Sequence, residues 1–178
     1  MKSVILCGGL GTRLREETEF RPKPMIMVGD KPILWHIMKL YSHYGFRDFI
    51  LCLGYKGEVI KNYFLEYDIV NSDFTICLGT KEITRHSVFH DESDWRVTLA
   101  ETGDRTMTGG RIKKIEKYID GDTFIMTYGD GLANINLREL IKFHKEKGKI
   151  ATVTGVRPVA RFGELSVDGD LVRDFSEK

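Results

Sequence analysis

The chain has 178 residues, enough for one domain with a sizeable hydrophobic core. Hydrophobic residues make up 42% and charged residues 30%, which is typical of a globular protein and excludes a disordered or fibrous chain. The 27 basic and 26 acidic residues are interspersed and give a net charge of +1, so the composition indicates no nucleic-acid-binding surface. No apolar run has the length of a membrane span, so we expect no membrane partner.

Short apolar runs alternate with helical patterns along the chain, which predicts an α/β fold with a mainly parallel sheet covered on both faces. The expected strands are Ser3–Leu6, Phe49–Leu53, Phe74–Leu78, Arg96–Ala100, Thr123–Tyr128 and Ile150–Val156. The expected helices are Ile33–Tyr44, a segment near Glu58–Tyr67, Ile112–Tyr118 and Leu137–Lys147. The polar stretch Lys81–Asp94 has neither period and is predicted to be a loop. Near the end, Gly163–Val167, the turn Asp168–Asp170 and Leu171–Ser176 predict a β-hairpin.

A glycine-rich turn follows the first expected strand, in the order Leu6-Cys7-Gly8-Gly9-Leu10-Gly11-Thr12-Arg13-Leu14. Glycines let several backbone N–H groups converge on phosphate oxygens, so the turn favours nucleotide binding. A dinucleotide fingerprint would need glycine where Leu14 stands, and the phosphate-loop motif would need Gly-Lys-Ser/Thr; neither is present. The alternative is a tight strand-to-helix turn with a surface arginine at position 13.

Two cations stand near this turn. Arg13 offers a planar fork for a polyphosphate, and Lys23, held between Pro22 and Pro24, offers a compact charge at a defined point. Together with the glycine turn they predict a triphosphate as the ligand.

Asp130 directly follows the expected strand Thr123–Tyr128 and is flanked by Gly129 and Gly131. A carboxylate at the end of a parallel strand is well placed to hold Mg²⁺ against triphosphate oxygens. The alternative is an ordinary Asp-Gly turn.

The three cysteines, Cys7, Cys52 and Cys77, are odd in number, lack metal-ligand spacing and lie in or beside apolar runs. We therefore expect small buried thiols in a reducing, cytoplasmic protein.

Several segments carry a family resemblance. The Gly-Gly-x-Gly-Thr-Arg-Leu loop followed by a Lys-Pro pair resembles the signature of the sugar nucleotidyltransferases. Within that superfamily the glucose-1-phosphate cytidylyltransferases are the most similar, through the segments Lys31–Met38, Gly54–Gly57, Thr102–Asp104, Thr108–Arg111 and Tyr128–Gly131. The resemblance implies the nucleotide-diphospho-sugar transferase fold, a Rossmann-like three-layer sandwich with a mainly parallel or mixed central sheet, here ending in the β-hairpin.

The resemblance also implies an activity: attack of the phosphate of glucose 1-phosphate on the α-phosphorus of CTP, with Mg²⁺ as cofactor, giving CDP-glucose and pyrophosphate. It implies catalytic roles for Arg13 and Lys23 and a metal role for Asp130. Nucleotide binding is expected at Leu6, Gly8, Gly9, Gly11, Thr12, Arg13, Lys23, Thr102, Gly103, Gly110 and Arg111, the last four selecting the nucleobase. Sugar-phosphate binding is expected at Tyr128, Gly129, Glu177 and Lys178.

Two alternatives remain open. Uridylyl- and thymidylyltransferases of the same superfamily share the loop and the lysine and differ in the base pocket. The family also takes a second metal-binding aspartate from a segment beyond the equivalent of Lys178. We expect residues 1–178 to be a single nucleotidyltransferase domain lacking that segment, which leaves a truncated, non-catalytic nucleotide-binding module as the second alternative. The resemblance further implies a homo-oligomer with a role in making sugars for surface polysaccharides.

Overall fold

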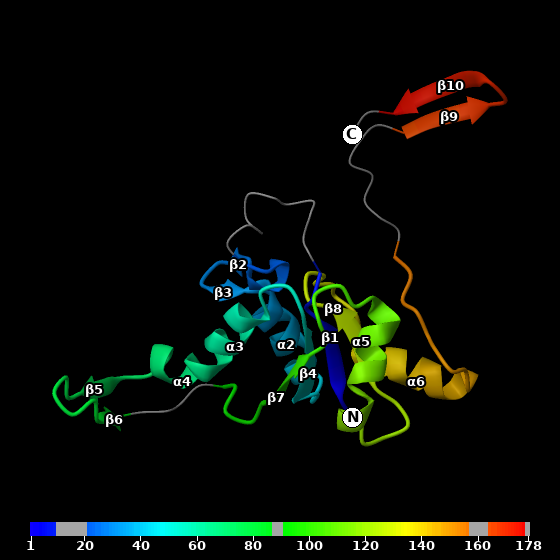
Figure 1. Cartoon of the computed structure of the whole chain (residues 1–178). Coiled ribbons are helices and arrows are strands. Elements are labelled where there is room, and N and C mark those ends of the chain that lie inside the picture. Colours follow the sequence, from blue (N-terminus) through cyan, green and yellow to red (C-terminus); the bar gives the residue numbers. More distant parts are fainter. Residues whose placement is uncertain (10–20, 87–90, 157–163, 177–178) are drawn as a thin grey trace. The chain divides into compact units, whose positions relative to one another are not determined.

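The computed structural model describes residues 1–9, 21–86, 91–156 and 164–176, in two compact units of residues 1–137 and 138–178. The first unit is built on four parallel strands: β1 (Ser3–Leu6), β4 (Asp48–Leu53), β7 (Arg96–Glu101) and β8 (Ile125–Tyr128). Their order across the sheet is β7-β4-β1-β8 (Figure 1).

The strand order reverses beside β1. From β1 the chain moves outward to β4 and then β7, and it returns to place β8 on the other side of β1. In parallel sheets of this kind, ligands bind beyond the carboxyl ends of the strands at the point of reversal. Here that point lies between the ends of β1 and β8, after Leu6 and Tyr128.

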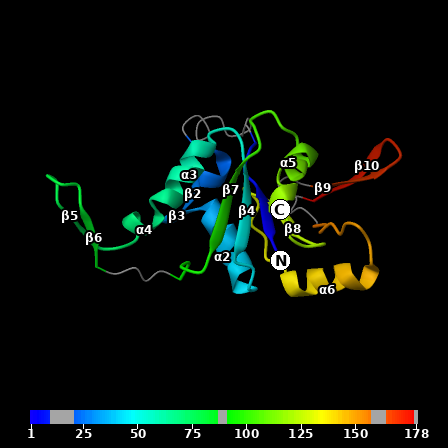
Figure 2. The same cartoon turned by 60° about the horizontal axis from the view of Figure 1, so that its bottom comes forward.

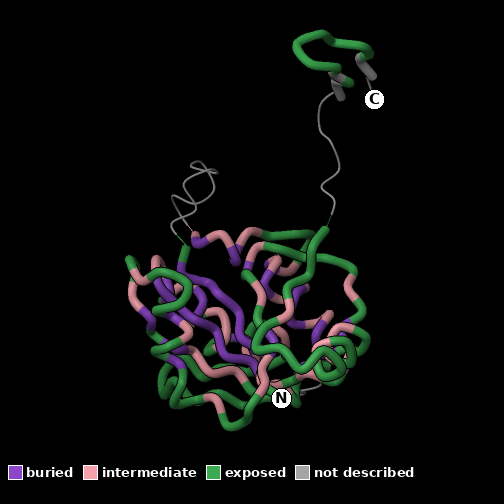
Figure 3. The backbone as a smooth tube through the Cα atoms, turned by 90° about the vertical axis from the view of Figure 1, so that its right-hand side faces the viewer, coloured by how far each residue is buried: buried purple, intermediate pink, exposed green. Residues whose placement is uncertain are grey.

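Helices cover both faces of the sheet. Helices α2 (Ile33–His43) and α3 (Gly57–Leu65) lie on one side, and α5 (Thr108–Lys114) lies on the other (Figure 2). The short η2 (Glu116–Tyr118) follows α5 in the chain. A strand covered on both faces must be apolar at consecutive positions. In β4, residues 49–53 are all fully buried. Figure 3 shows buried backbone, in purple, running through the middle of the first unit.

The two faces of the sheet have separate cores. On the α5 side, buried residues of three strands pack with Ile115, which follows α5; they are Val4, Leu6, Ile50, Cys52 and Ala100. On the other side, the ring centroids of Phe49 and Trp95 are 5.3 Å apart. Helix α2 supplies the buried residues Leu34, Ile37, Met38 and Tyr41, whose spacing is that of one helix face.

Short elements complete the first unit. They are η1 (Lys23–Met25), the pair β2 (Met27–Val28) and β3 (Lys31–Pro32), α4 (Tyr67–Val70), and the antiparallel pair β5 (Phe74–Ile76) and β6 (Ile83–Arg85). Across the ranges that the structure describes, every helix is too short or too polar to cross a membrane.

The second unit holds α6 (Leu137–Lys147), which begins at the boundary, and a hairpin of β9 (Glu164–Asp168) and β10 (Leu171–Ser176). Gly169 turns this hairpin with a φ of +59°, a conformation that glycine adopts without steric cost. The predicted C-terminal hairpin and the predicted helix Leu137–Lys147 are confirmed.

The predicted α/β class and parallel sheet are also confirmed, with four corrections. Ile150–Val156 is not a strand, and Ile150 and Val153 are almost fully exposed. The segment Phe74–Leu78 contributes β5, which pairs with β6 outside the central sheet, and β6 lies within the expected loop Lys81–Asp94. The helix expected from Ile112 begins at Thr108.

Candidate functional site

The ends of β1 and β8 are joined at the point where the strand order reverses. The backbone N–H of Gly129 donates to the carbonyl oxygen of Leu6 at 2.9 Å, which extends the ladder one step beyond Tyr128. The N–H of Cys7 donates to the carbonyl of Cys52 at 3.0 Å and fixes the start of the glycine-rich turn to β4. The segments that carry Gly8 and Asp130 therefore leave the sheet side by side.

Gly129 allows the Pro-Lys-Pro segment to approach this edge. A β-carbon on Gly129 would lie 2.8 Å from Cγ of Pro24 and 3.1 Å from the sulfur of Cys7. The first distance is too short for a real side chain and the second is tight, so a larger residue here would have to displace Pro24. Pro24 is buried against this glycine and sets the position of Lys23, which opens the short helix η1.

Lys23 and Asp130 form an ion pair at the reversal point. Nζ of Lys23 lies 2.5 Å from Oδ2 of Asp130, and the two side chains are 32% and 33% exposed. The pair joins two residues that are 107 positions apart in the chain. A predicted phosphate-binding cation and a predicted metal-binding carboxylate thus lie together in a setting that solvent and ligands reach.

Arg111 lies at the neighbouring strand ends, on helix α5. Its side chain is buried, and Nη1 donates to the carbonyl of Leu53 at 2.9 Å and to Oγ1 of Thr102 at 2.6 Å. Nη2 donates to the carbonyls of Gly8 at 2.8 Å and Asp104 at 3.2 Å. One guanidinium therefore connects the segments that follow β1, β4 and β7.

Two glycines make room for this guanidinium. A β-carbon on Gly8 would lie 2.1 Å from Nη1 of Arg111, and one on Gly54 would lie 2.8 Å from the same atom. The absent side chain at position 8 thus serves the packing of Arg111, in addition to any role of its backbone toward phosphate. Gly54 is a site residue that our sequence reasoning did not assign, although its place directly after an apolar strand was a usable signal.

Thr102 is fully buried and completes the same network. Its hydroxyl donates to the carbonyl of Leu53 and accepts from Arg111. Lys114 adds a contact from α5, because its Nζ donates to the carbonyl of Thr102 at 2.9 Å. Gly103 follows with a φ of +90°, which a residue with a side chain rarely adopts.

The structure sorts the predicted site residues into three groups. One group lies at the ends of β1 and β8 and comprises Leu6, Gly8, Gly9, Lys23, Tyr128, Gly129 and Asp130. A second group lies after β7 and at the start of α5 and comprises Thr102, Gly103, Gly110 and Arg111. The third group lies outside the described residues and comprises Gly11, Thr12, Arg13, Glu177 and Lys178.

Cys7 and Cys52, the cysteines nearest the site, are unreactive thiols. Burial raises the pKa of the Cys7 thiol far above its usual range, and the nearby Asp130 adds to the rise. Burial likewise raises the pKa of Cys52 to about 11. Since the thiolate is the reactive form, neither residue is a nucleophile near neutral pH.

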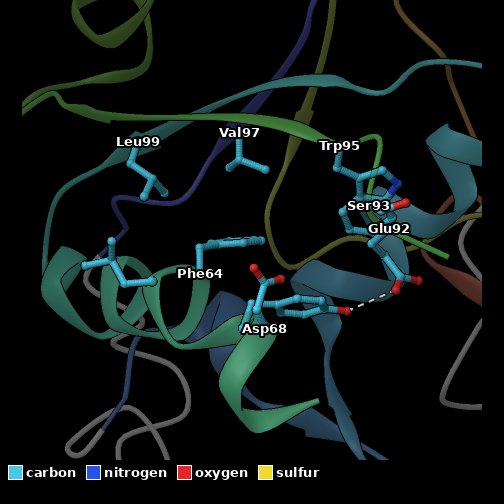
Figure 4. Close-up of a pocket in the computed structure, with 9 residues that line it drawn as sticks. Phe64, Asp68, Glu92, Ser93, Trp95, Val97 and Leu99 are labelled. Carbon is cyan, nitrogen blue, oxygen red and sulfur yellow. Dashed lines mark hydrogen bonds between the residues drawn. The ribbon is translucent and has the colours of Figure 1, made fainter. Parts of the chain in front are cut away.

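A separate cavity of about 480 Å³ lies elsewhere in the first unit, between α3, α4 and β7 (Figure 4). It is lined by Phe64, Leu65, Tyr67, Asp68, Glu92, Ser93, Trp95, Val97 and Leu99. The hydroxyl of Tyr67 donates to Glu92 at 3.2 Å, the contact drawn as a dashed line. The cavity contains none of the residues predicted to bind nucleotide.

Comparison with known proteins identifies the family. Residues 2–178 match the family model described as nucleotidyl transferase. The chain belongs to this family. It is 52% identical over 178 residues to the probable glucose-1-phosphate cytidylyltransferase of Bacillus subtilis, and 52% identical over 180 residues to the glucose-1-phosphate cytidylyltransferase of Salmonella typhi. Both alignments cover the whole of this chain and 69% of the relative.

A solved structure is also similar to this chain. HddC from Yersinia pseudotuberculosis, complexed with GMP-PN, matches with a TM-score of 0.59 and 26% identity over 99% of this chain and 69% of that one. These matches confirm the resemblance to sugar nucleotidyltransferases and the predicted fold type.

Proposed function

We propose that the protein is a glucose-1-phosphate cytidylyltransferase, which makes CDP-glucose and pyrophosphate from CTP and glucose 1-phosphate. The 52% identity to two relatives bearing that name supports the choice of reaction. The structural observation that carries the proposal is the Lys23–Asp130 pair at the reversal point of the sheet, beside the turn that begins at Cys7.

The reaction needs positioning and charge neutralisation more than proton transfer. A phosphate oxygen of the sugar phosphate forms the new bond to the α-phosphorus of CTP, and the bond from that phosphorus to the bridging oxygen breaks as pyrophosphate leaves. The attacking phosphate is already a nucleophile, so no general base is required. Lys23 would donate to the oxygens of the α-phosphate and of its attacker, where charge must be neutralised in the transition state.

Asp130 fits a divalent cation, because its carboxylate already draws a cationic group to this edge of the sheet. In the described ranges no three acidic, histidine or cysteine side chains gather as a metal cage, so the remaining ligands would be substrate oxygens and water. Mg²⁺ is commonly held in this way, by one or two carboxylates and the substrate's phosphates. When bound, Mg²⁺ would supply neutralising charge for the triphosphate.

The remaining predicted contacts belong to the same proposal. Arg13 would bind the β- and γ-phosphates as they leave, and the glycine-rich turn would donate backbone N–H groups to the triphosphate. Thr102, Gly103, Gly110 and Arg111 would border the nucleobase.

The sugar phosphate would be bound by a second set of residues, Tyr128, Gly129, Glu177 and Lys178. A carboxylate such as Glu177 accepts from sugar hydroxyls, and an ammonium such as Lys178 binds a phosphate.

The test is pyrophosphate release from the full 178-residue chain with Mg²⁺, glucose 1-phosphate and, in parallel, CTP, UTP, dTTP or ATP. Release with CTP alone is expected. Release with UTP or dTTP instead would favour the uridylyl or thymidylyl alternative. Nucleotide binding without release would favour the non-catalytic module.

Substitution of Lys23 tests its role in the transition state. Lys23→Ala should lower kcat by on the order of a hundredfold, the usual cost of losing a transition-state contact. Its matched control is Lys113→Ala, which removes an exposed lysine that pairs with the exposed Glu116. Unfolding curves of both variants should match the wild type, and a near-normal rate in Lys23→Ala would remove that residue from the mechanism.

A further inference from the structure

The Lys23–Asp130 ion pair places a positive charge where the proposed function requires a metal ion. The ammonium of Lys23 contacts Oδ2 of Asp130, the carboxylate that would bind Mg²⁺. A divalent cation on this carboxylate would lie within a few Å of the ammonium, and the two cations would repel each other. Metal binding at Asp130 therefore has to displace or weaken the lysine contact.

We propose that Lys23 occupies the cation site of Asp130 in the free protein, and that nucleotide and metal bind together by an exchange of partners. This inference rests on the proposed function. In the exchange, Asp130 releases Lys23 and accepts the divalent cation, while Lys23 turns to the nucleotide's phosphate oxygens. No proton moves, and no covalent bond forms or breaks.

The local packing permits such an exchange. The backbone on both sides is fixed, because Pro24 packs on Gly129 and Gly129 is hydrogen-bonded to Leu6. The two charged groups are about one-third exposed, so ligands reach them without opening the core. A lysine has a flexible four-carbon stem that can move its ammonium while the backbone stays in place.

Charge balance explains why both ligands are needed. The ion pair is neutral in the free protein. A divalent cation alone would leave an excess of positive charge, since it would take the carboxylate that the structure pairs with the ammonium of Lys23. A triphosphate supplies the ammonium with another anion. Each ligand therefore strengthens the binding of the other, and the coupling is reciprocal by linkage.

The first experiment measures Mn²⁺ binding to the full chain without nucleotide, by the electron paramagnetic resonance signal of free Mn²⁺. Lys23→Met should bind Mn²⁺ about fivefold more tightly than the wild type, the fold-change expected from removing a partly exposed ion pair. The control Lys113→Met deletes an equal charge from the exposed pair with Glu116 and should stay within about twofold of the wild type. If Lys23→Met binds no more tightly than Lys113→Met, including when neither binds measurably, the exchange is refuted.

Asp130→Asn separates this inference from the proposed function. If Asp130→Asn binds Mn²⁺ as well as the wild type does, Asp130 is not the metal ligand. The exchange and the metal role of Asp130 in the proposed function are then both refuted. If Asp130→Asn no longer binds Mn²⁺ and Lys23→Met binds it no more tightly than the wild type, only the exchange is refuted.

Repeating the titration with CTP measures the coupling, once the Mn²⁺ held by CTP without protein has been subtracted. CTP should tighten Mn²⁺ binding by a larger factor in the wild type than in Lys23→Met, because only the wild type gains an anionic partner for the displaced lysine. Equal factors in the two proteins would contradict the exchange even if the first experiment supports it.

Discussion

Replacement of Arg111 by methionine should destabilise the protein by about 3 kcal/mol. The variant loses four hydrogen bonds from one buried guanidinium, at 2.6 to 3.2 Å. Hydrogen bonds from charged groups contribute about 1.5–3 kcal/mol each, and a buried acceptor left without a donor costs about 1–3 kcal/mol. The carbonyl of Leu53 still accepts from the N–H of Thr102, and the variant no longer buries a charge. The net loss of stability is therefore well below the sum of the four hydrogen-bond contributions.

The assay is urea unfolding followed by the fluorescence of Trp35 and Trp95. The free energy of unfolding typically falls by about 2 kcal/mol per M urea, so the urea midpoint of Arg111→Met should be about 1.5 M lower than that of the wild type. Arg96→Met is the matched control, because Arg96 is 80% exposed and lies 3.9 Å from its carboxylate partner. An exposed substitution of this kind changes stability by less than about 0.5 kcal/mol.

Arg111→Lys distinguishes geometry from charge. A lysine keeps the positive charge but lacks the planar fork that reaches several acceptors at once. It should therefore lose most of the stability that methionine loses. If Arg111→Met unfolds at the same midpoint as Arg96→Met, the guanidinium does not hold the strand ends together and our reasoning is wrong.

Two further predictions concern the same edge of the sheet. Gly129→Ala should lower stability by about 1–3 kcal/mol, because its β-carbon would lie 2.8 Å from the ring of Pro24; urea unfolding checks this, and an unchanged midpoint would show that the segment yields freely. In the folded protein a thiol reagent at neutral pH should modify Cys77 and leave Cys7 and Cys52 intact. Cys77 is exposed, and a hydrogen bond from the side chain of Thr80 is the chief cause of its lowered pKa, whereas burial raises the pKa of Cys7 and Cys52. Mass spectrometry after limited reaction measures which cysteine is modified first. Labelling of Cys7 before Cys77 would contradict the prediction.

Local sequence patterns predicted most elements of the first unit. The apolar run of β4 and the apolar stripe of α2 each specify their own structure, because burial against the sheet follows from period and polarity. The prediction from apolar patterns was wrong where an apolar segment is not buried in the structure. Ile150–Val156 contains β-branched apolar residues typical of a strand, yet the structure gives it no pairing and leaves Ile150 and Val153 exposed.

The start of α5 shows a second limit of prediction from local sequence. Glycines at positions 109 and 110 and the preceding threonine are typical of a loop, so the helix was expected only from Ile112. In the structure these residues form the first turn of the helix, and Arg111 on that turn reaches carbonyls at three strand ends. Tertiary hydrogen bonds here outweigh a weak local propensity.

The sequence by itself determined the class of fold, the family, and the residue types that favour phosphate and metal, because glycine spacing, strand polarity and a Lys-Pro pair are local features. Only the tertiary structure decided which of those residues meet. Lys23 and Asp130 are 107 positions apart, and they form a pair because β1 lies between β4 and β8 and Gly129 admits Pro24. The buried role of Arg111 likewise depends on Gly8 and Gly54, whose missing side chains leave its guanidinium room, and no local pattern encodes that space.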